Sequence, residues 1–429
     1  MRLDEYVDIE ANERAERRRL AKEKSYAIMD QLERFQHRFD EAVQGDSTFG
    51  SVSPSIFVGS GNYPNVATGI LSPVGHEEQA DRFETSGAWY DEGVGIEDVF
   101  QRRTSLLNSN QATDVRRVGA DASTSVHDAW EGFVGVQREV AIADRPVSVE
   151  IGLDGAPEID FDVSDDDIAT PTGPRARAES AALGENPHVP RPVKKTLEDD
   201  DWQAQGAMNY LYRRGFDVYE INSILSAGAL GRGENRRLVP TRWSITAVDD
   251  TVGQFLRGTI RDTPSVDSVQ VYRNEYLGNA FWVVLAPGQW EYELVEMKAP
   301  GSIWNPDPQA GLWMSSDREG YEGRTGYVDE TAGAYYAARL GVLEHLSDIG
   351  RQAKVLVLRH VSDDYWGPVG VWQVRETVRN AFGDEGAEAE TFGDAVRGVT
   401  EHLPVSTNDL RRKSGMVSGL QTNLADFGP

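Results

Sequence analysis

The sequence predicts an α+β fold with two mixed units, an amphipathic helix ahead of the first unit and a flexible tail behind the second. Apolar residues recur at helical spacing in some segments and at every second position in others. At 429 residues the chain is also longer than one ordinary hydrophobic core accommodates. Hydrophobic residues make up 39% of it, with 10 Trp, 15 Tyr and 14 Phe, which excludes a wholly disordered protein.

The first 48 residues are predicted to form the amphipathic helix, and residues 49–153 are predicted to form a first α+β domain. Short β-type runs such as 55–59, punctuated by Pro and Gly, open this domain. In the N-terminal segment the apolar side chains recur every three to four residues, which is the spacing of one helix face: Tyr26, Ile28, Met29, Leu32, Phe35 and Phe39.

Residues 154–195 are expected to form an acidic, Pro-rich linker or an exposed insertion. They consist mainly of Asp, Pro, Ala, Gly and Arg, and they include the runs 165–167 (Asp-Asp-Asp) and 171–174 (Pro-Thr-Gly-Pro). A segment with so few large apolar side chains has little to bury. We therefore expect the chain to resume a folded domain only after this stretch.

Residues 196–383 predict a second α+β domain. It begins with a helical pattern over 202–225, and alternation predicts strands over 269–276, 281–286 and 290–297. The short turn Leu277-Gly278-Asn279 joins the first two strands, so we expect a β-meander. The pattern then predicts a helix over 330–349, a buried strand over 354–358 and a helix over 371–382.

Residues 384–429 are expected to be a flexible tail. They are acidic and rich in Gly and Ala, then rich in Ser and Thr, and they contain few large apolar residues before the chain closes.

The charge composition indicates a protein adapted to concentrated salt. The chain has 70 acidic and 43 basic residues, for a net charge of −27, and only seven of the basic residues are Lys. An acidic surface depleted of Lys is typical of halophilic proteins. In molar salt the Debye length falls to about 3 Å, so this charge does not exclude nucleic acid as a partner.

Several function classes are excluded or disfavoured by composition. The absence of Cys rules out disulfides, thiolate catalysis and Cys-ligated zinc. The seven His are scattered without metal-ligand spacing, so we expect neither a metal nor another cofactor. No apolar stretch is long enough to span a membrane and no signal peptide opens the sequence, so we expect a cytoplasmic protein.

The last residues carry the most informative motif. Gln421, Leu424 and Phe427 form the pattern Q-x-x-L-x-x-F, which is the spacing of a PCNA-interacting peptide, or PIP motif. In such a peptide one 3₁₀ turn presents the Leu and the aromatic residue as a plug. Many such peptides carry two consecutive aromatics, whereas Gly428 follows Phe427 here. The pattern predicts docking onto the ring-shaped sliding clamp PCNA.

Three further segments resemble a known family. Residues 53–64, containing Ser-Pro-Ser-Ile-Phe-Val-Gly and Tyr-Pro, and residues 240–250 are similar to those of the archaeal NreA family of DNA-repair proteins, as is the stretch 281–304. The resemblance spans most of residues 50–385 and the tail. It implies a role in DNA damage repair with recruitment to the clamp, in a haloarchaeal member of the family.

Candidate catalytic residues lie on the expected strand 290–297 and its extension. Alternation places Glu296 and Lys298 on one face together with Tyr292 and Leu294. A carboxylate two residues before a Lys is how some Mg²⁺-dependent nucleases arrange a metal ligand and a charge stabiliser, and Asp249 or Asp250 could supply the second carboxylate. An ordinary ion pair along a strand gives the same pattern.

Candidate DNA contacts lie in the Gly-rich segment 301–327. Trp313, Arg318, Tyr321 and Arg324 interleave aromatic and basic side chains, which suits stacking on unpaired bases and contact with phosphates. Aromatic residues in a long loop also serve to fix it to the core. Three hypotheses therefore stay open: a clamp-recruited repair protein, a Mg²⁺-dependent repair nuclease, and a non-catalytic adaptor between the clamp and other repair proteins.

Overall fold

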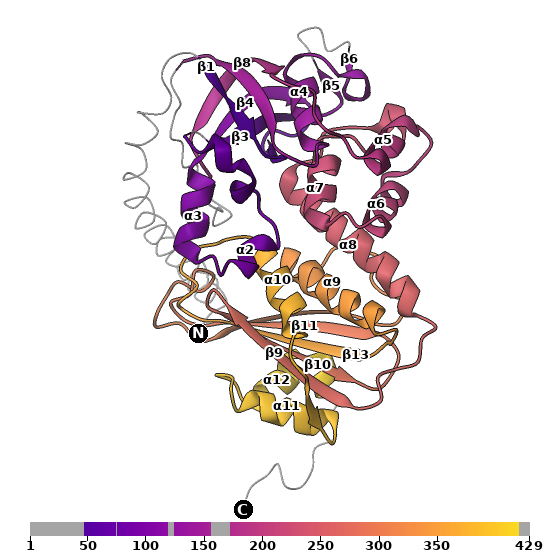
Figure 1. The fold of residues 1–429 in the computed structure, drawn as a ribbon. Helices are drawn as coiled ribbons and strands as arrows, with labels where there is room; N and C mark the ends of the chain where they lie inside the picture. Colours follow the sequence, from indigo (N-terminus) through magenta and orange to yellow (C-terminus); the bar gives the residue numbers. More distant parts are fainter. Residues whose placement is uncertain (1–46, 74, 119–123, 156–171, 420–429) are drawn as a thin grey trace, which may run out of the picture. The chain divides into compact units, whose positions relative to one another are not determined.

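The computed structural model describes residues 47–73, 75–118, 124–155 and 172–419 (Figure 1). These residues divide into two compact units, 47–252 and 253–419, called here the first and the second unit. Each unit combines helices with one mixed sheet, so the predicted α+β class is confirmed. A helix was expected within residues 1–48. Residues 1–46 lie outside the described residues, and residues 47 and 48 belong to strand β1.

The sheet of the first unit has the strand order β1-β7-β8-β4-β3-β2. Neighbouring strands are antiparallel except β8 and β4, which are parallel. Their bounds are β1 Ser47–Val52, β2 Ile56–Val58, β3 Asn65–Pro73, β4 Leu106–Asp114, β7 Val147–Leu153 and β8 Arg175–Leu183, with the short β5 Arg117–Val118 and β6 Thr124–Ser125 beyond the end of β4.

Helix α4 (Gly132–Ala141) carries much of the core of the first unit. Phe133, Val136 and Val140 recur at helical spacing and are buried with the side chains of the sheet. The other helices are η1 Glu77–Phe83, α2 Ala88–Asp91, α3 Ile96–Thr104, η2 Val126–Asp128, α5 Arg191–Glu198, α6 Ala204–Arg213, α7 Val218–Ser226 and η3 Gly233–Asn235, and α8 (Thr241–Ile260) crosses the boundary of the units.

Two features of the first unit differ from the expectations. Residues 172–195, expected in the linker, contain strand β8 and part of α5. In β8 the inward positions are Ala176 and Ala178, which are buried but too small to mark a strand by hydrophobicity. The helical pattern over 202–225 is two helices, because Gly215 adopts a φ of +87° between α6 and α7.

The sheet of the second unit has the order β12-β11-β13-β10-β9-β14. The expected hairpin is present: β9 (Val269–Tyr276) pairs with β10 (Asn279–Ala286), and the turn has positive φ at Leu277 and Gly278. The expected meander is wrong, because β13 (Lys354–Val361) lies between β10 and β11 (Glu291–Lys298) and runs parallel to β11. The edge strands are β12 (Trp313–Glu319), inside the expected loop, and β14 (Ala387–Ala389).

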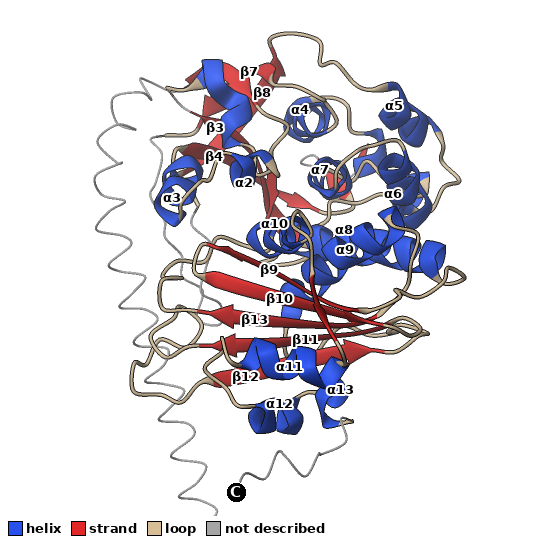
Figure 2. Ribbon diagram, turned by 60° about the horizontal axis from the view of Figure 1, so that its bottom comes forward, coloured by secondary structure: helices blue, strands red, loops and turns tan. Residues whose placement is uncertain are grey.

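Helices cover both faces of this sheet (Figure 2). Helices α9 (Ala332–Asp348) and α10 (Trp372–Ala381) lie on one face. Helices α11 (Phe392–Thr400), α12 (Thr407–Lys413) and α13 (Gly415–Ser418) lie on the other, although this part of the chain was expected to be mobile. Their few apolar residues suffice because several of them, among them Val396 and Leu410, are fully buried.

No helix among the residues that the structure describes is long and apolar enough to cross a membrane.

Candidate functional site

Glu296 and Lys298 share one face of β11, as their spacing predicts, and both are buried. The Lys298 Nζ lies 3.2 Å from Glu296 Oε2. Arg359, which stands opposite Glu296 on β13, donates from Nη1 to Glu296 Oε1 at 2.5 Å. Both carboxylate oxygens therefore have a cationic partner. Sequence reasoning missed Arg359 because only the parallel pairing of β11 and β13 brings it to Glu296.

This cluster is built to hold an ionised carboxylate inside the unit. Burial opposes ionisation of Glu296, but Lys298 and Arg359 outweigh it and lower the pKa of Glu296 below its ordinary value. Arg359 is satisfied in turn by Asn279, whose Oδ1 accepts from Nε at 3.0 Å and from Nη2 at 2.7 Å. The arrangement resembles a buried ion pair with its hydrogen bonds completed, and it leaves the carboxylate little freedom to bind a metal.

The remaining nuclease candidates lie elsewhere in the fold. Asp249 and Asp250 are on the part of α8 that belongs to the first unit, and Asp249 is buried. Within the described ranges, no group of three or more His, Cys, Asp or Glu could hold a metal ion. The described residues thus assemble an ion cluster around Glu296 but no Mg²⁺ ligand set.

The aromatic segment 301–327 is organised around edge strand β12. Trp313 begins this strand, is 45% exposed and has the Lys298 ammonium 4.5 Å from its ring centroid. Arg318 is exposed, and its side chain runs across Gly415, where a Cβ would collide with the guanidinium. Trp313 and Arg318 therefore both present surface to solvent.

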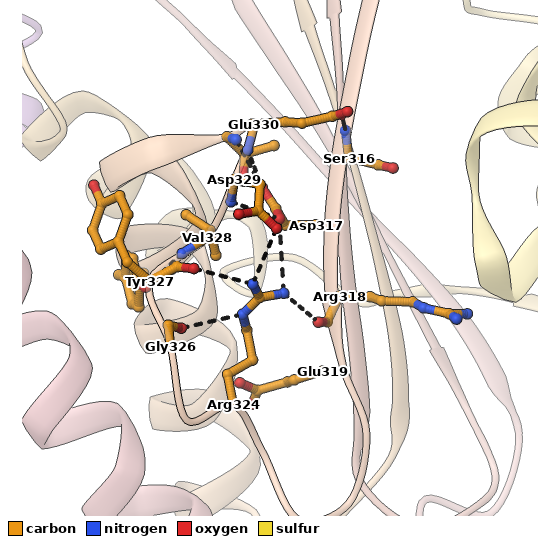
Figure 3. A network of polar contacts seen from close by, with 12 residues as sticks. Ser316, Asp317, Arg318, Glu319, Arg324, Gly326, Tyr327, Val328, Asp329 and Glu330 are labelled. Atoms are coloured by element: carbon orange, nitrogen blue, oxygen red, sulfur yellow. Dashed lines mark hydrogen bonds and ion pairs between the residues drawn. The ribbon is translucent and has the colours of Figure 1, made fainter.

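Arg324 serves the loop that follows β12 (Figure 3). Its guanidinium donates to the backbone carbonyls of Arg318 at 2.9 Å and Tyr327 at 3.2 Å, and it lies 3.7 Å from the buried Asp317 carboxylate. Figure 3 shows the Arg318 side chain on the other side of the strand, pointing away from this network. Arg324 is thus engaged in closing the loop.

Asp317 is the centre of that network. Its carboxylate accepts from the backbone amides of Asp329, Glu330 and Thr331 and from the Thr331 hydroxyl at 2.8 to 3.1 Å. Burial opposes its ionisation, but these donors outweigh burial and lower the pKa of Asp317.

Tyr321 also holds the loop in place. Its ring has the Arg261 guanidinium 4.4 Å from the centroid, and its hydroxyl donates to the Arg261 carbonyl at 3.3 Å. Of the four residues expected to contact DNA, Tyr321 and Arg324 are committed to local structure, whereas Trp313 and Arg318 stay available on the surface.

The clamp-binding candidates Gln421, Leu424 and Phe427 lie outside the described residues. What the structure describes is the chain that leads to them. Buried Glu293 on β11 accepts from the Ser414 hydroxyl at 2.6 Å and from the Gly415 and Met416 amides at 2.8 and 2.9 Å. This carboxylate fixes α13 to the sheet immediately before the terminal motif. Sequence reasoning missed Glu293 because its partners are about 120 residues away.

A cavity of about 290 Å³ in the first unit is a second feature that sequence reasoning missed. Four acidic residues from three separate segments line it: Glu84, Asp144, Asp217 and Glu220. Burial, reinforced by the neighbouring Glu220 and Asp81, raises the pKa of Glu84 to about 7. Burial also raises the pKa of Glu220. A carboxyl group this close to half-protonation at neutral pH is a pH-sensitive feature of the unit.

Comparison with known families places the chain. The model described as "Archaeal Nre, N-terminal" matches residues 20–305, and the model "Archaeal Nre, C-terminal" matches residues 319–427. The chain belongs to the archaeal Nre family. The gap between the two matched regions, residues 306–318, lies inside the second unit and contains all of β12 except Glu319. The sheet therefore takes β9, β10 and β11 from the first matched region and β13 and β14 from the second.

Curated Nre relatives match over nearly the whole chain. The DNA repair protein NreA of Haloferax volcanii is 73% identical over 427 residues, covering 100% of both chains. The DNA repair proteins NreA and NreB of Archaeoglobus fulgidus are 35% and 34% identical, covering 91% and 88% of this chain and 93% and 91% of their own. No solved structure matches this Nre chain.

Proposed function

We propose that this Nre chain acts in DNA repair and that its last residues recruit it to the PCNA sliding clamp. The repair role is supported by full-length relatives that are themselves named DNA repair proteins. Recruitment is supported by one observation above all: Gln421, Leu424 and Phe427 have the Q-x-x-L-x-x-F spacing of a PCNA-interacting peptide.

Glu293 fixes the position of residues 414–416, shortly before this motif in the chain. Residues up to Ser418 are held on the sheet, so the motif begins only a few residues beyond a fixed helix. Burial of Leu424 and Phe427 on the clamp would contribute about 1.5–3 kcal/mol each before ordering costs, which is compatible with micromolar affinity.

The nuclease alternative has less support. It needs Glu296 as a metal ligand, whereas the carboxylate already has Lys298 and Arg359 on its two oxygens. We assign these three residues to the stability of the sheet. In the adaptor alternative the chain still docks onto the clamp, but it links the clamp to other repair proteins and does not itself contact nucleic acid.

Calorimetric titration of the clamp with the full chain in concentrated KCl tests the recruitment. Truncation after Leu420 should abolish binding, and Phe427→Ala should lower affinity at least about tenfold, because it removes half of the apolar plug. Thr422→Ala changes a position between the motif residues and is the matched control, with affinity near that of the unchanged chain. Undiminished binding after truncation would overturn the proposal.

A further inference from the structure

Two large aromatic side chains form an exposed pair on the first unit. Tyr63, two residues before β3, is 41% exposed, and Trp243, in the first turn of α8, is 48% exposed. Their ring centroids are 5.2 Å apart with an interplanar angle of 47°. Exposed Trp and Tyr in direct contact place flat apolar ring faces in water, where an aromatic ligand can stack on them.

The pair stands on a rigid support. The Val58 amide of β2 donates to Thr241 Oγ1 at 2.9 Å, which ties the start of α8 to the sheet edge. One turn further on, buried Ser244 donates to Asn222 Oδ1 at 2.5 Å. Trp243 therefore lies in the first turn of α8 between two residues, Thr241 and Ser244, that are hydrogen-bonded to other segments. Little conformational entropy remains to be lost when a ligand stacks on it.

Two exposed arginines adjoin backbone segments that hydrogen-bond next to Tyr63. The Val115 amide donates to the Pro64 carbonyl at 2.9 Å, and the Leu238 amide donates to the Val115 carbonyl at 2.9 Å, so three segments meet beside Tyr63. Arg116 and Arg237 are the exposed neighbours of the buried Val115 and Leu238. Neither guanidinium forms a hydrogen bond or an ion pair with another residue in the described part of the chain. Arg242, next to Trp243, is also exposed.

We propose that this surface, defined by Tyr63, Arg116, Arg237 and Trp243, binds unpaired nucleotides of single-stranded DNA. The aromatic faces would stack on bases, and the arginines would reach the adjoining phosphates. In a chain with a net charge of −27, exposed arginines around exposed aromatics are complementary to an anionic chain that carries flat apolar groups. The inference rests on the proposed repair function and names the kind of DNA that it engages.

Fluorescence anisotropy of a labelled oligothymidylate tests the stacking, with the full chain in about 1 M KCl, where phosphate attraction is largely screened. Trp243→Ala should weaken binding at least about fivefold, and Trp243→Phe should retain part of the affinity, because a smaller ring still stacks. Phe49→Ala removes another exposed aromatic, 68% accessible, from the same unit and should leave affinity unchanged. Equal affinity of the unchanged chain for a duplex of the same length would contradict the inference.

The salt dependence of binding tests the arginines. Each phosphate contact adds about 0.7 to the slope of log affinity against log salt for a single strand. Arg116→Gln together with Arg237→Gln should therefore reduce the slope by about 1.4. An unchanged slope would remove these arginines from the site, and no binding by the unchanged chain would overturn the inference and favour the adaptor hypothesis. The same variants should bind the clamp as the unchanged chain does, because the substitutions at Trp243, Arg116 and Arg237 lie outside the terminal motif. Clamp titration therefore distinguishes a failure of this inference from a failure of the proposed recruitment.

Discussion

At the scale of single residues, the charged side chains inside this protein mostly hold structure. Glu296 on β11 accepts a hydrogen bond from Arg359 on β13. Asp317 accepts hydrogen bonds from the backbone amides of the three residues just before α9. Burial alone would raise the pKa of both carboxylates. The cations around Glu296 and the hydrogen-bond donors around Asp317 outweigh burial, so both pKa values are lowered. Glu84 is the opposite case, since its burial beside other acidic groups raises its pKa.

Glu84 makes stability depend on pH in a defined direction. Its pKa rises from 4.5 to about 7 on folding, so its contribution is complete below pH 4.5 and is lost as pH climbs through 7. Glu84→Gln removes the buried charge and should raise the free energy of unfolding at about pH 8 by about 1–3 kcal/mol, with little change near pH 5. Denaturant unfolding at both pH values measures this.

The control for this prediction is Glu78→Gln, which changes an exposed carboxylate on the neighbouring η1. It should alter stability by less than about 0.5 kcal/mol at either pH. A gain for Glu84→Gln of the same size at both pH values would show that titration of Glu84 is not its cause.

At the scale of elements, helix α13 depends on one strand residue. Four residues cannot form a stable helix alone, and Glu293 supplies hydrogen-bond acceptors for its first turn. The same carboxylate holds the Ser414 hydroxyl. This buried anion therefore holds the start of α13 on the sheet, and the buried Val417 adds apolar contact.

Glu293→Ala should detach this segment at a cost of about 2–4 kcal/mol, because hydrogen bonds to a buried charge are lost together. Hydrogen exchange of amides 415–418 should accelerate while the amides of β10 stay protected. Glu291→Ala, on the same strand with only a half-exposed contact to Lys354 at 3.7 Å, should cost less than about 1 kcal/mol. Unchanged exchange at 415–418 would show that the anchor lies elsewhere.

At the scale of the whole molecule, charge sets the conditions in which the chain folds. A net charge of −27 produces self-repulsion that salt screens. Raising KCl from about 0.1 M to about 1 M should increase the thermal unfolding midpoint by at least about 5 °C. Circular dichroism melts over a KCl series check this, and a midpoint that is constant or falls with salt would contradict it.

Local sequence patterns predict some strands and helices of the molecule and miss others. Strand 269–276 and the shared face of Tyr292, Glu296 and Lys298 follow from alternation, and the structure has them as predicted. The insertion of β13 between β10 and β11 does not follow, because adjacency in a sheet depends on pairing between distant segments. Strand β8 and helices α11–α13 also escape prediction, since a few small or isolated apolar residues form their buried side.

By itself, the sequence determined the fold class, helices α9 and α10, several strands of the second unit, the acidic character and the Q-x-x-L-x-x-F pattern. These features follow from composition or from residues near one another in the chain. Only the tertiary structure decided that Arg359 neutralises Glu296, that Glu293 anchors α13, and that Tyr63 contacts Trp243. These partners come from separate segments. Their meeting is set by strand register and core packing, which residue periodicity does not encode.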